Sequence, residues 1–366
     1  MKRHTPLPLP GLSRRSLVGR AVVVGAALGL GSRLGRALAQ DATPSAGPVE
    51  FLWETRGDPA DPLGNPAHLA VAPDGSIWVA DGDNHRFQIF APDGSLLEVW
   101  GTLGSGDGEF DFTTAGWAGY EYGAVAFAPD GTFYVADPGN HRIQRFGPDR
   151  DFLTAWGSEG KEPGQFVTPM DLVVDGQGRV YVADADREWL PPPETGAVQV
   201  FDADGRYLAE WGVFGNDPGQ MNTPFGIGLD PDGTLLVAEF GGNRVQRFTP
   251  EGEVLDGWGG RGSADGEFIW AMDAAVDAAG RVFVTDYSNN RVQVFDRDGR
   301  FLAAWGKYGT DAGEFASALG VAVGDDGIVY VTDEGKRLQA FRVGDLTVAG
   351  PATPAAAAGA AGTPSG

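Results

Sequence analysis

Three residues that can bind a metal ion occupy one recurring position of the sequence. Six similar segments each contain a turn glycine, and in every second segment the residue seven places before it is His68, Asp171 or Asp273. One imidazole and two carboxylates that converge can hold a divalent cation such as Ca²⁺ or Zn²⁺, with water in the remaining positions. The alternative is that these side chains cap backbone amides or face water. The intervening segments have small residues at this position: Ala124, Gly226 and Gly320.

Two insertions that interrupt the repeated pattern are rich in aromatic residues. Residues 110–122 (FDFTTAGWAGYEY) and 186–196 (DREWLPPPETG) extend two connections between predicted strands. Exposed Trp and Tyr on such connections are typical anchors for a ligand. Neutral variation in loop length is the alternative. The sequence predicts a ligand-binding face that includes Trp117, Tyr120, Tyr122, Trp189 and Trp270.

The elements that position these residues are copies of one pattern. The stretch VAPDGSIWVADGDNHRFQIFAPDGSLLEVWG from Val71 recurs from Phe127, Leu229 and Val276, with a stretched copy from Val173 and a truncated one from Val323. An acidic residue marks each copy, at intervals of 56, 47, 55, 47 and 47 residues. Repeats of this length with Asp-Gly turns predict the four-stranded blades of a β-propeller. The marking residues are Asp81, Asp137, Asp184, Glu239, Asp286 and Asp333.

The first copy shows the four strands of a blade. Leu69–Val71, Ile77–Ala80 and Phe87–Phe90 are rich in apolar and aromatic residues, and a fourth strand ends at Trp100. The last copy stops after Phe341–Val343, whereas Val49–Trp53 has the pattern of a fourth strand. The sequence therefore predicts an all-β, six-bladed propeller of antiparallel blades, closed by an N-terminal strand. Completion of the last blade by 345–348 is the alternative.

A short motif within the repeat resembles the NHL family. Asn84-His85-Arg86 and Asn140-His141-Arg142, each followed by an apolar residue, Gln and an aromatic strand end, are similar to the NHL signature, with Arg in place of Leu. The resemblance covers about 49–343 and implies a six-bladed propeller. The family includes RNA-binding, protein-binding and sensor domains, and a metal-dependent lyase that acts on peptidyl-hydroxyglycine. That lyase needs several channel histidines, and only His68 is suitably placed here.

Residues present in every copy are predicted to be structural. This applies to the six acidic residues, to the arginines that follow them and to the Trp that ends each fourth strand. His85 and His141 belong to the repeat and receive the same interpretation. The sequence contains no Cys, P-loop, Gly-x-Ser-x-Gly or His-Glu-x-x-His motif, which excludes the chemistry that each of these supports.

The first 39 residues have the features of an export signal. Arg14 and Arg15 form a twin-arginine pair, a short apolar run follows, and Ala37-Leu38-Ala39 is a cleavage pattern. The run is too short to span a bilayer. The sequence thus predicts a periplasmic or extracellular protein with no stable membrane insertion. We expect a linker over 40–48, the propeller over 49–346 and a disordered tail rich in Ala, Pro and Gly over 347–366.

The charge of the chain disfavours one class of partner. The formal net charge is −23; seven of the 27 basic residues and none of the 50 acidic ones lie in residues 1–39, so the remaining chain carries −30. Nucleic-acid binding depends on Lys and Arg and is therefore disfavoured. The sequence predicts a monomeric scaffold that binds a peptide, protein or glycan. The alternative function is a metal-dependent lyase or lactone hydrolase.

Overall fold

The computed structural model describes residues 48–114, 121–185 and 196–346. The predicted export signal with Arg14 and Arg15, the linker up to residue 47 and the predicted tail lie outside the described residues. So do three of the predicted anchors, Trp117, Tyr120 and Trp189. In the described part, no helix is long and apolar enough to cross a membrane.

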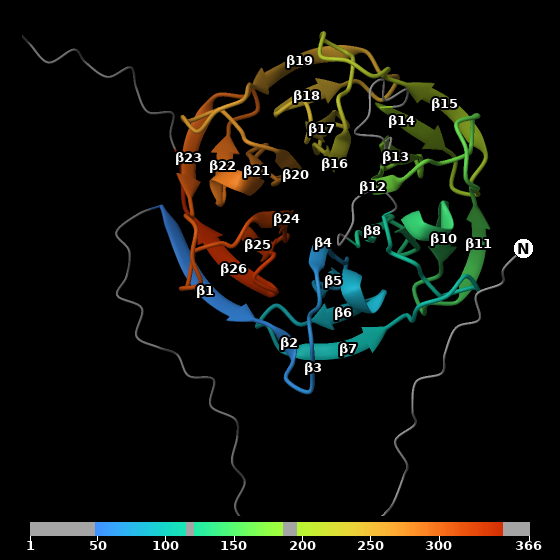
Figure 1. Cartoon of the computed structure of the whole chain (residues 1–366), viewed down its shortest axis with the longest axis horizontal. Helices are drawn as coiled ribbons and strands as arrows, with labels where there is room; N and C mark the ends of the chain where they lie inside the picture. Colours follow the sequence, from blue (N-terminus) through green and yellow to red (C-terminus); the bar gives the residue numbers. More distant parts are fainter. Residues whose placement is uncertain (1–47, 115–120, 186–195, 347–366) are drawn as a thin grey trace, which may run out of the picture. The chain divides into compact units, whose positions relative to one another are not determined.

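Six four-stranded antiparallel sheets are arranged around a central axis, one for each copy of the repeat (Figure 1). The prediction of an all-β, six-bladed propeller is confirmed. Three single-turn 3₁₀ helices follow the second strands of blades 1, 2 and 5: η1 (Gly82–Asn84), η2 (Pro138–Asn140) and η3 (Tyr287–Asn289).

The strands of the six blades occupy four equivalent positions from the axis outwards. The innermost strands are β4 (Pro66–Val71), β8 (Ala124–Phe127), β12 (Pro169–Val174), β16 (Pro224–Leu229), β20 (Ala271–Val276) and β24 (Ala318–Val323). The second strands are β5 (Ile77–Asp81), β9 (Phe133–Asp137), β13 (Val180–Ala185), β17 (Leu235–Glu239), β21 (Val282–Asp286) and β25 (Ile328–Asp333). The third strands are β6 (Arg86–Phe90), β10 (Arg142–Phe146), β14 (Gly196–Phe201), β18 (Arg244–Phe248), β22 (Arg291–Phe295) and β26 (Arg337–Val343). The outermost strands are β7 (Leu96–Trp100), β11 (Phe152–Trp156), β15 (Tyr207–Trp211), β19 (Val254–Gly259), β23 (Phe301–Trp305) and β1 (Val49–Thr55).

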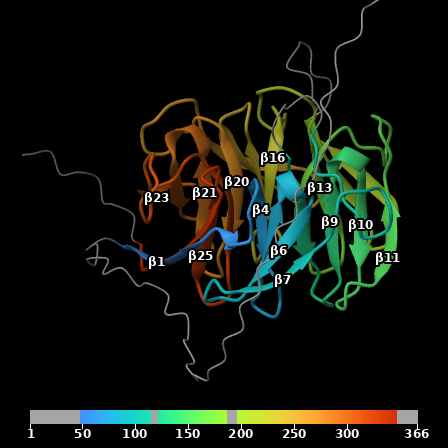
Figure 2. The ribbon, with the colours of Figure 1, turned by 60° about the horizontal axis from the view of Figure 1, so that its bottom comes forward.

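Blade 6 combines strands from the two ends of the propeller sequence. β1 pairs antiparallel with β26, with Val49 opposite Val343 and Thr55 opposite Leu338, and it lies beside the red strands in Figures 1 and 2. The bend after β1 contains a short additional pair, β2 (Gly57–Asp58) with β3 (Asp61–Pro62).

The core is formed by the facing surfaces of neighbouring blades. Between blades 1 and 2, for example, the ring of Trp100 lies 5.0 Å from that of Phe146 and 5.6 Å from that of Phe133. Each blade buries one face on its predecessor and the other on its successor, so the second and third strands are buried on both sides. Successive strands of each blade run in opposite directions, so the ring has two distinct ends. The connections between blades lie at one end, here called the loop end, and the first hairpin of each blade lies at the other, the hairpin end.

Candidate functional site

His68, Asp171 and Asp273 occupy equivalent positions near the start of three innermost strands. Each is the third residue of its strand, in β4, β12 and β20. The pairing with the second strand shifts register at this point in all three blades. A β-bulge re-aims side chains locally, and here the three side chains converge in the channel along the propeller axis.

The structure brings the three candidate ligands together. One ligand atom from each residue lies within 4.8 Å of the other two. The imidazole Nε2 of His68 is 3.0 Å from Oδ1 of Asp171. The other ring nitrogen of His68, Nδ1, is buried and has no hydrogen-bond partner among the described residues. We call His68, Asp171 and Asp273 the channel triad.

Both carboxylates of the triad also accept hydrogen bonds from the backbone. Asp171 accepts from its neighbour Leu172 N–H at 2.7 Å and from Ile227 N–H of the next blade at 2.8 Å. Asp273 accepts in the same way from Ala274 N–H at 2.7 Å and from Val321 N–H at 2.9 Å. Each carboxylate oxygen has two lone pairs, so these bonds hold the carboxylates in place and leave acceptor capacity toward the axis.

The alternation between ligands and small residues has a steric cause. A Cβ on Gly226 would lie 2.7 Å from Oδ1 of Asp273, and one on Gly320 would lie 2.8 Å from the carbonyl oxygen of Ala67. The backbone and carboxylate of Asp273 and the carbonyl oxygen of Met272 together take the space that a side chain at residue 226 would need.

The charge of the triad is unbalanced, and this perturbs two pKa values. Burial opposes the charged form of His68, but the charges of Asp171 and Asp273 and the hydrogen bond to Asp171 raise the pKa of its imidazole to about 9. Burial raises the pKa of Asp273 to about 6; the charge of His68 counteracts this rise and that of Asp171 adds to it. Two carboxylates facing one imidazole therefore form a site that favours an added positive charge.

A layer of apolar side chains separates the triad from the loop end. Five of its six members directly precede a residue of the triad layer, Tyr122 lies two places before Ala124, and each member is 7 % exposed or less. A space of about 10 Å³ lies between this layer and the triad. Such a volume accommodates about one water-sized particle. The apolar layer consists of Ala67, Tyr122, Met170, Phe225, Met272 and Leu319.

On the other side of the triad, the channel continues toward the hairpin end. This part has a volume of about 290 Å³, and His68 and Asp273 line it together with aliphatic residues such as Ala70, Val173 and Ala275. The apolar layer lies between the triad and the loop end, and the described part of the channel reaches the triad from the hairpin end.

The two predicted anchors within the described residues differ in exposure. Tyr122 is only 3 % exposed and packs against Phe225, with ring centroids 4.9 Å apart, so it is a packing residue rather than an exposed anchor. Trp270 is partly exposed and stacks on Phe240 at 4.8 Å. Its φ is positive (68°), as are those of Thr223 and Ser317 at the equivalent positions of blades 4 and 6. Trp270 is much larger than either of these residues.

The six repeated acidic residues, here called the rim carboxylates, have structural partners. All are 4 % exposed or less. Five pair with the arginine that begins the third strand, at 2.6–2.9 Å. The exception is Asp184, because Ala197 replaces the arginine in blade 3. The rim carboxylates are Asp81, Asp137, Asp184, Glu239, Asp286 and Asp333.

The two histidines of the repeat connect neighbouring blades. Nδ1 of His85 accepts a hydrogen bond from Phe112 N–H at 3.0 Å, and Nδ1 of His141 lies 3.0 Å from Val167 O. Asn243 and Asn290 make the equivalent contacts, to Trp270 N–H and Ser317 N–H. The residue at this position therefore ties one blade to the start of the next.

Sequence reasoning missed the apolar layer and its relation to the triad. The signal was present, because Met170, Phe225, Met272 and Leu319 each directly precede a residue of the triad layer. Their large size contrasts with the small residues that follow along the same strands. It also missed Thr285, whose hydroxyl oxygen accepts from Asp273 N–H at 3.0 Å.

The NHL repeat matches residues 63–90 and 123–146, and a six-bladed β-propeller family matches residues 271–346. The protein is a six-bladed β-propeller that carries NHL repeats. Among curated relatives, NHL repeat-containing protein 3 of Homo sapiens is 27 % identical over 173 residues, which is 44 % of either chain. Peptidyl-glycine alpha-amidating monooxygenase B of Xenopus laevis is 34 % identical over 149 residues, 38 % of this chain and 15 % of that protein. The propeller thus matches less than half the length of each of these two relatives.

Solved structures share the fold of this NHL-repeat propeller at low identity. A gluconolactonase from Xanthomonas campestris superposes with a TM-score of 0.56 at 17 % identity, covering 82 % of this chain and 89 % of that one. A streptogramin B lyase superposes with a TM-score of 0.54 at 13 % identity, covering 81 % and 98 %. These likenesses concern the fold, on which both enzymes and binding scaffolds are built.

Proposed function

We propose that this exported NHL-repeat propeller binds one divalent cation at the channel triad and acts as a metal-dependent enzyme on a small carbonyl compound. The observation that carries the proposal is the convergence of His68, Asp171 and Asp273, with ligand atoms within 4.8 Å of one another beside a space of about 10 Å³. A metal ligand must be the neutral imidazole, so binding of a cation would release the proton of His68 and leave a triad charge of −2, which a divalent cation neutralises.

The residues present fit a bound metal ion. The carboxylates are oriented by backbone N–H groups of two blades each, in the way that outer-shell hydrogen bonds orient metal ligands. His68 Nδ1 has no partner within the described residues, so the imidazole is held by its Nε2 contact alone and can turn toward an ion.

Of the two expected ions, Zn²⁺ suits this donor set better than Ca²⁺. Imidazole is a common ligand of Zn²⁺, whereas Ca²⁺ takes six to eight oxygen ligands. His68, Asp171 and Asp273 would supply three protein ligands to Zn²⁺, the number typical of catalytic zinc, and the neighbouring space would admit about one water. When bound, such an ion polarises a carbonyl oxygen or activates a water.

The channel sets the class of ligand that reaches the triad. Apart from the triad, the side chains that line it toward the hairpin end are uncharged, mostly aliphatic with Phe127, so a charged ligand would find no charged side chain there to offset the loss of its hydration. Small uncharged carbonyl compounds, such as lactones, meet this requirement. The apolar layer keeps the reacting centre dry on its other side.

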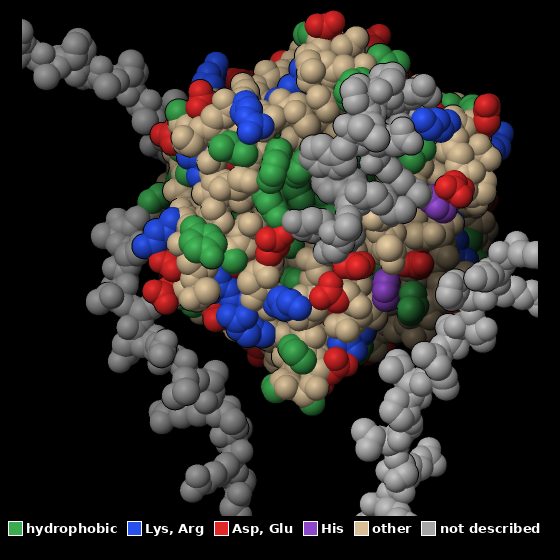
Figure 3. All heavy atoms as spheres, in the orientation of Figure 1, with side chains coloured by type: hydrophobic (Ala, Val, Ile, Leu, Met, Phe, Trp, Pro, Cys, Tyr) green, Lys and Arg blue, Asp and Glu red, His purple; other side chains and the backbone are tan. Residues whose placement is uncertain are grey.

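A binding scaffold for a peptide, protein or glycan at the loop end is the second candidate. Trp270 supports it, because it places a partly exposed aromatic ring at a strained position where the equivalent blades have Thr or Ser. The face in Figure 3 mixes acidic and basic side chains, so this view offers no area of one sign to a charged partner. Removal of the metal ion distinguishes the two candidate functions. Chelation should abolish ligand binding by the enzyme and leave ligand binding by the scaffold unaffected.

Equilibrium dialysis against Zn²⁺ with elemental analysis tests the proposal. We expect one Zn²⁺ per chain in the wild type and at least a 100-fold weaker affinity in His68→Ala. Because His68 Nδ1 has no partner and the ring borders the channel, this variant is expected to fold. A metal content unchanged by His68→Ala would contradict the proposal, as would the absence of stoichiometric zinc.

A pair of variants at equivalent positions tests the site without replacing any of the three ligand residues. Gly226→Ala introduces a methyl group 2.7 Å from Asp273 Oδ1 and should weaken zinc binding at least tenfold. Ala124→Gly, at the equivalent position of blade 2, should bind zinc as the wild type does. Equal affinities in the two variants would show that the position of Asp273 does not matter for the metal.

A further inference from the structure

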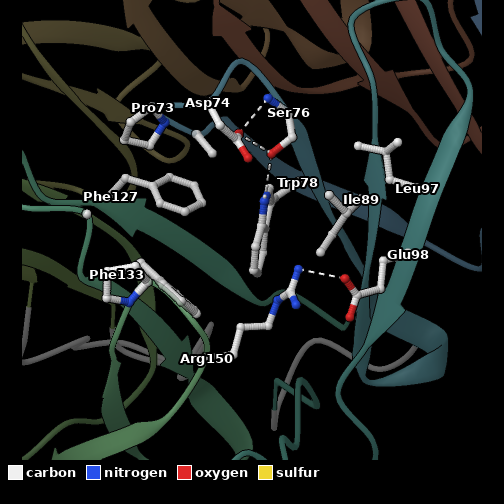
Figure 4. Close-up of a pocket in the computed structure, with 13 residues that line it drawn as sticks. Pro73, Asp74, Ser76, Trp78, Ile89, Leu97, Glu98, Phe127, Phe133 and Arg150 are labelled. Atoms are coloured by element: carbon white, nitrogen blue, oxygen red, sulfur yellow. Dashed lines mark hydrogen bonds and ion pairs between the residues drawn. The ribbon is translucent and has the colours of Figure 1, made fainter.

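A pocket between blades 1 and 2 opens at the hairpin end, apart from the channel. It has a volume of about 260 Å³. Figure 4 shows Trp78 between Phe127 and Ile89, with Asp74 and Ser76 at one end and Arg150 and Glu98 at the other. The pocket therefore combines an aromatic and aliphatic interior with charged groups around its opening.

Arg150 breaks the repeat at a position that otherwise requires glycine. It lies in the β10–β11 hairpin with a φ of 67°, whereas Gly94, Gly205, Gly252 and Gly299 occupy the equivalent turns at 74–87°. A Cβ at these four glycines would lie 2.2–2.7 Å from a Trp ring. A non-glycine residue in this conformation costs about 1–2 kcal/mol and points to a functional constraint.

The side chain of Arg150 lies over Trp78 in the neighbouring blade. Its guanidinium carbon is 5.3 Å from the centroid of the Trp78 ring, and Nη2 is 2.7 Å from Oε2 of Glu98. Nε of Arg150 is buried and has no hydrogen-bond partner in the part of the chain that the structure describes. A buried N–H without an acceptor is costly, and an oxygen atom of a ligand would satisfy it.

Trp78 also departs from the repeat. The equivalent residues in the other blades are Tyr134, Tyr181, Leu236, Phe283 and Tyr330, so blade 1 has the largest side chain. Its indole N–H donates to Ser76 Oγ at 3.2 Å, and Ser76 Oγ donates to Asp74 Oδ1 at 2.6 Å. Two unusual residues from two blades thus meet in one pocket.

We propose that this pocket binds a neutral pyranose ring. An anion would face two carboxylates and a guanidinium that is already paired with Glu98. A cation would compete with Arg150 for the face of Trp78. Hydroxyl groups both donate and accept, so they match the carboxylates of Asp74 and Glu98 and the free N–H of Arg150. The C–H face of a sugar packs on the apolar side chains of the lining, which include Phe127 and Leu97 on opposite sides of Trp78.

The size of the pocket restricts the ligand to about one ring. Pockets for drug-sized ligands measure about 300–1,000 Å³, and this one lies just below that range. The ring comes either from a free monosaccharide or from the terminal unit of a glycan. The pocket lies at the hairpin end, so it is separate from the predicted face formed by the insertions and adds to the proposed function of the channel.

Saturation-transfer NMR with three methyl glycosides tests the proposal: α-glucopyranoside, β-galactopyranoside and N-acetyl-β-glucosaminide. We expect transfer to the ring C–H protons of at least one glycoside in the wild type. The signal should fall at least fivefold in Arg150→Gly and in Trp78→Leu. Arg150→Gly restores the turn glycine of other blades and is expected to keep the melting temperature within a few degrees. Trp78→Leu introduces the residue of blade 4 but removes a core ring, so its signal is compared at a temperature where circular dichroism shows it folded.

Matched controls separate ring recognition from non-specific contact. Arg206→Ala removes an exposed arginine from the corresponding hairpin of blade 3 and should leave the signal unchanged. Sorbitol, an open-chain polyol, should show no transfer. With maltotriose, transfer confined to the non-reducing ring identifies a glycan end, whereas weaker transfer than from the monosaccharide identifies a free sugar. Absence of transfer from all three glycosides, or equal transfer in folded Arg150→Gly, would overturn the proposal.

Discussion

The rim carboxylates and the channel triad are two sets of buried ionisable groups with opposite designs. Five rim carboxylates have an arginine that neutralises them, and the arginine also donates to backbone carbonyls of the preceding loop. The triad has two carboxylates and one imidazole, and it lacks a permanent cation within the described residues. In a repeat protein, an ion pair that recurs from copy to copy stabilises the blades. Buried charges that lack such a pair and occur only in alternate copies indicate a ligand-binding site.

Removal of a rim partner should have the largest effect on stability. Arg337 is fully buried, pairs with Asp333 at 2.6 Å and donates to Glu314 O at 2.7 Å. Arg337→Ala leaves the buried carboxylate of Asp333 without its cation, with only the N–H of Ala316 as a donor, which costs about 3–5 kcal/mol in the free energy of unfolding. Urea denaturation measures this change. Arg342→Ala is the control, because the Arg342–Glu50 pair is exposed and worth about 1 kcal/mol at most. Similar losses in the two variants would contradict the structural role of the rim.

Asp184, the rim carboxylate without an arginine, should make stability depend on pH. Burial raises its pKa from 3.8 to about 7, although the N–H groups of Thr168 and Val167 oppose the shift. Between pH 4 and 7 the folded state then holds a proton that the unfolded state has released. The contribution of Asp184 is therefore present below pH 4 and lost as the pH rises to about 7, by at most about 4 kcal/mol.

Asp184→Asn should remove this dependence, since the amide resembles the protonated carboxyl. Relative to the wild type, the variant should gain stability from pH 4 to 7 and remain level above pH 7. Chemical denaturation at several pH values measures the difference. The exposed Asp204→Asn is the control and should follow the wild type throughout. A constant difference between Asp184→Asn and the wild type would show that Asp184 is charged in the folded state over this whole range.

The smallest expected effects on stability come from substitutions at two equivalent hairpin turns. Gly205→Ala places a Cβ 2.4 Å from the ring of Trp156 at a φ of 83°, so it should cost about 2 kcal/mol. Arg150→Gly at the equivalent turn releases strain while losing the contact with Trp78, so it should stay within about 1 kcal/mol of the wild type. Thermal unfolding in parallel measures both. A large loss in Arg150→Gly would assign Arg150 to the stability of the blade rather than to ligand binding.

The fold could be predicted from the sequence because the four-strand pattern of a blade occurs six times. The predicted strands of the first copy agree with β4 to β7 to within one residue apart from the start of β4, which begins at Pro66 rather than Leu69. The difference arises at the β-bulge around His68, where the pairing shifts and the regular pattern is interrupted. The position that carries the triad was visible from its spacing alone.

Other properties of the triad depend on distances between blades, which spacing does not encode. That Asp171 bonds to Ile227 N–H and Asp273 to Val321 N–H follows from the way consecutive blades stagger. The burial of Tyr122 was missed for the same reason, because the aromatic residues of an insertion were interpreted without the neighbours that cover them. Arg150 was missed because a polar turn is predicted at this position whether its third residue is glycine or arginine.

The most direct test of the metal site is an anomalous difference map at the zinc edge, from crystals of the protein dialysed against Zn²⁺. We expect one peak on the propeller axis, at about 2.0–2.2 Å from Nε2 or Nδ1 of His68 and from one oxygen each of Asp171 and Asp273. A map without a peak at the triad, with zinc bound elsewhere or nowhere, would contradict the proposal that the alternating ring position is a metal site.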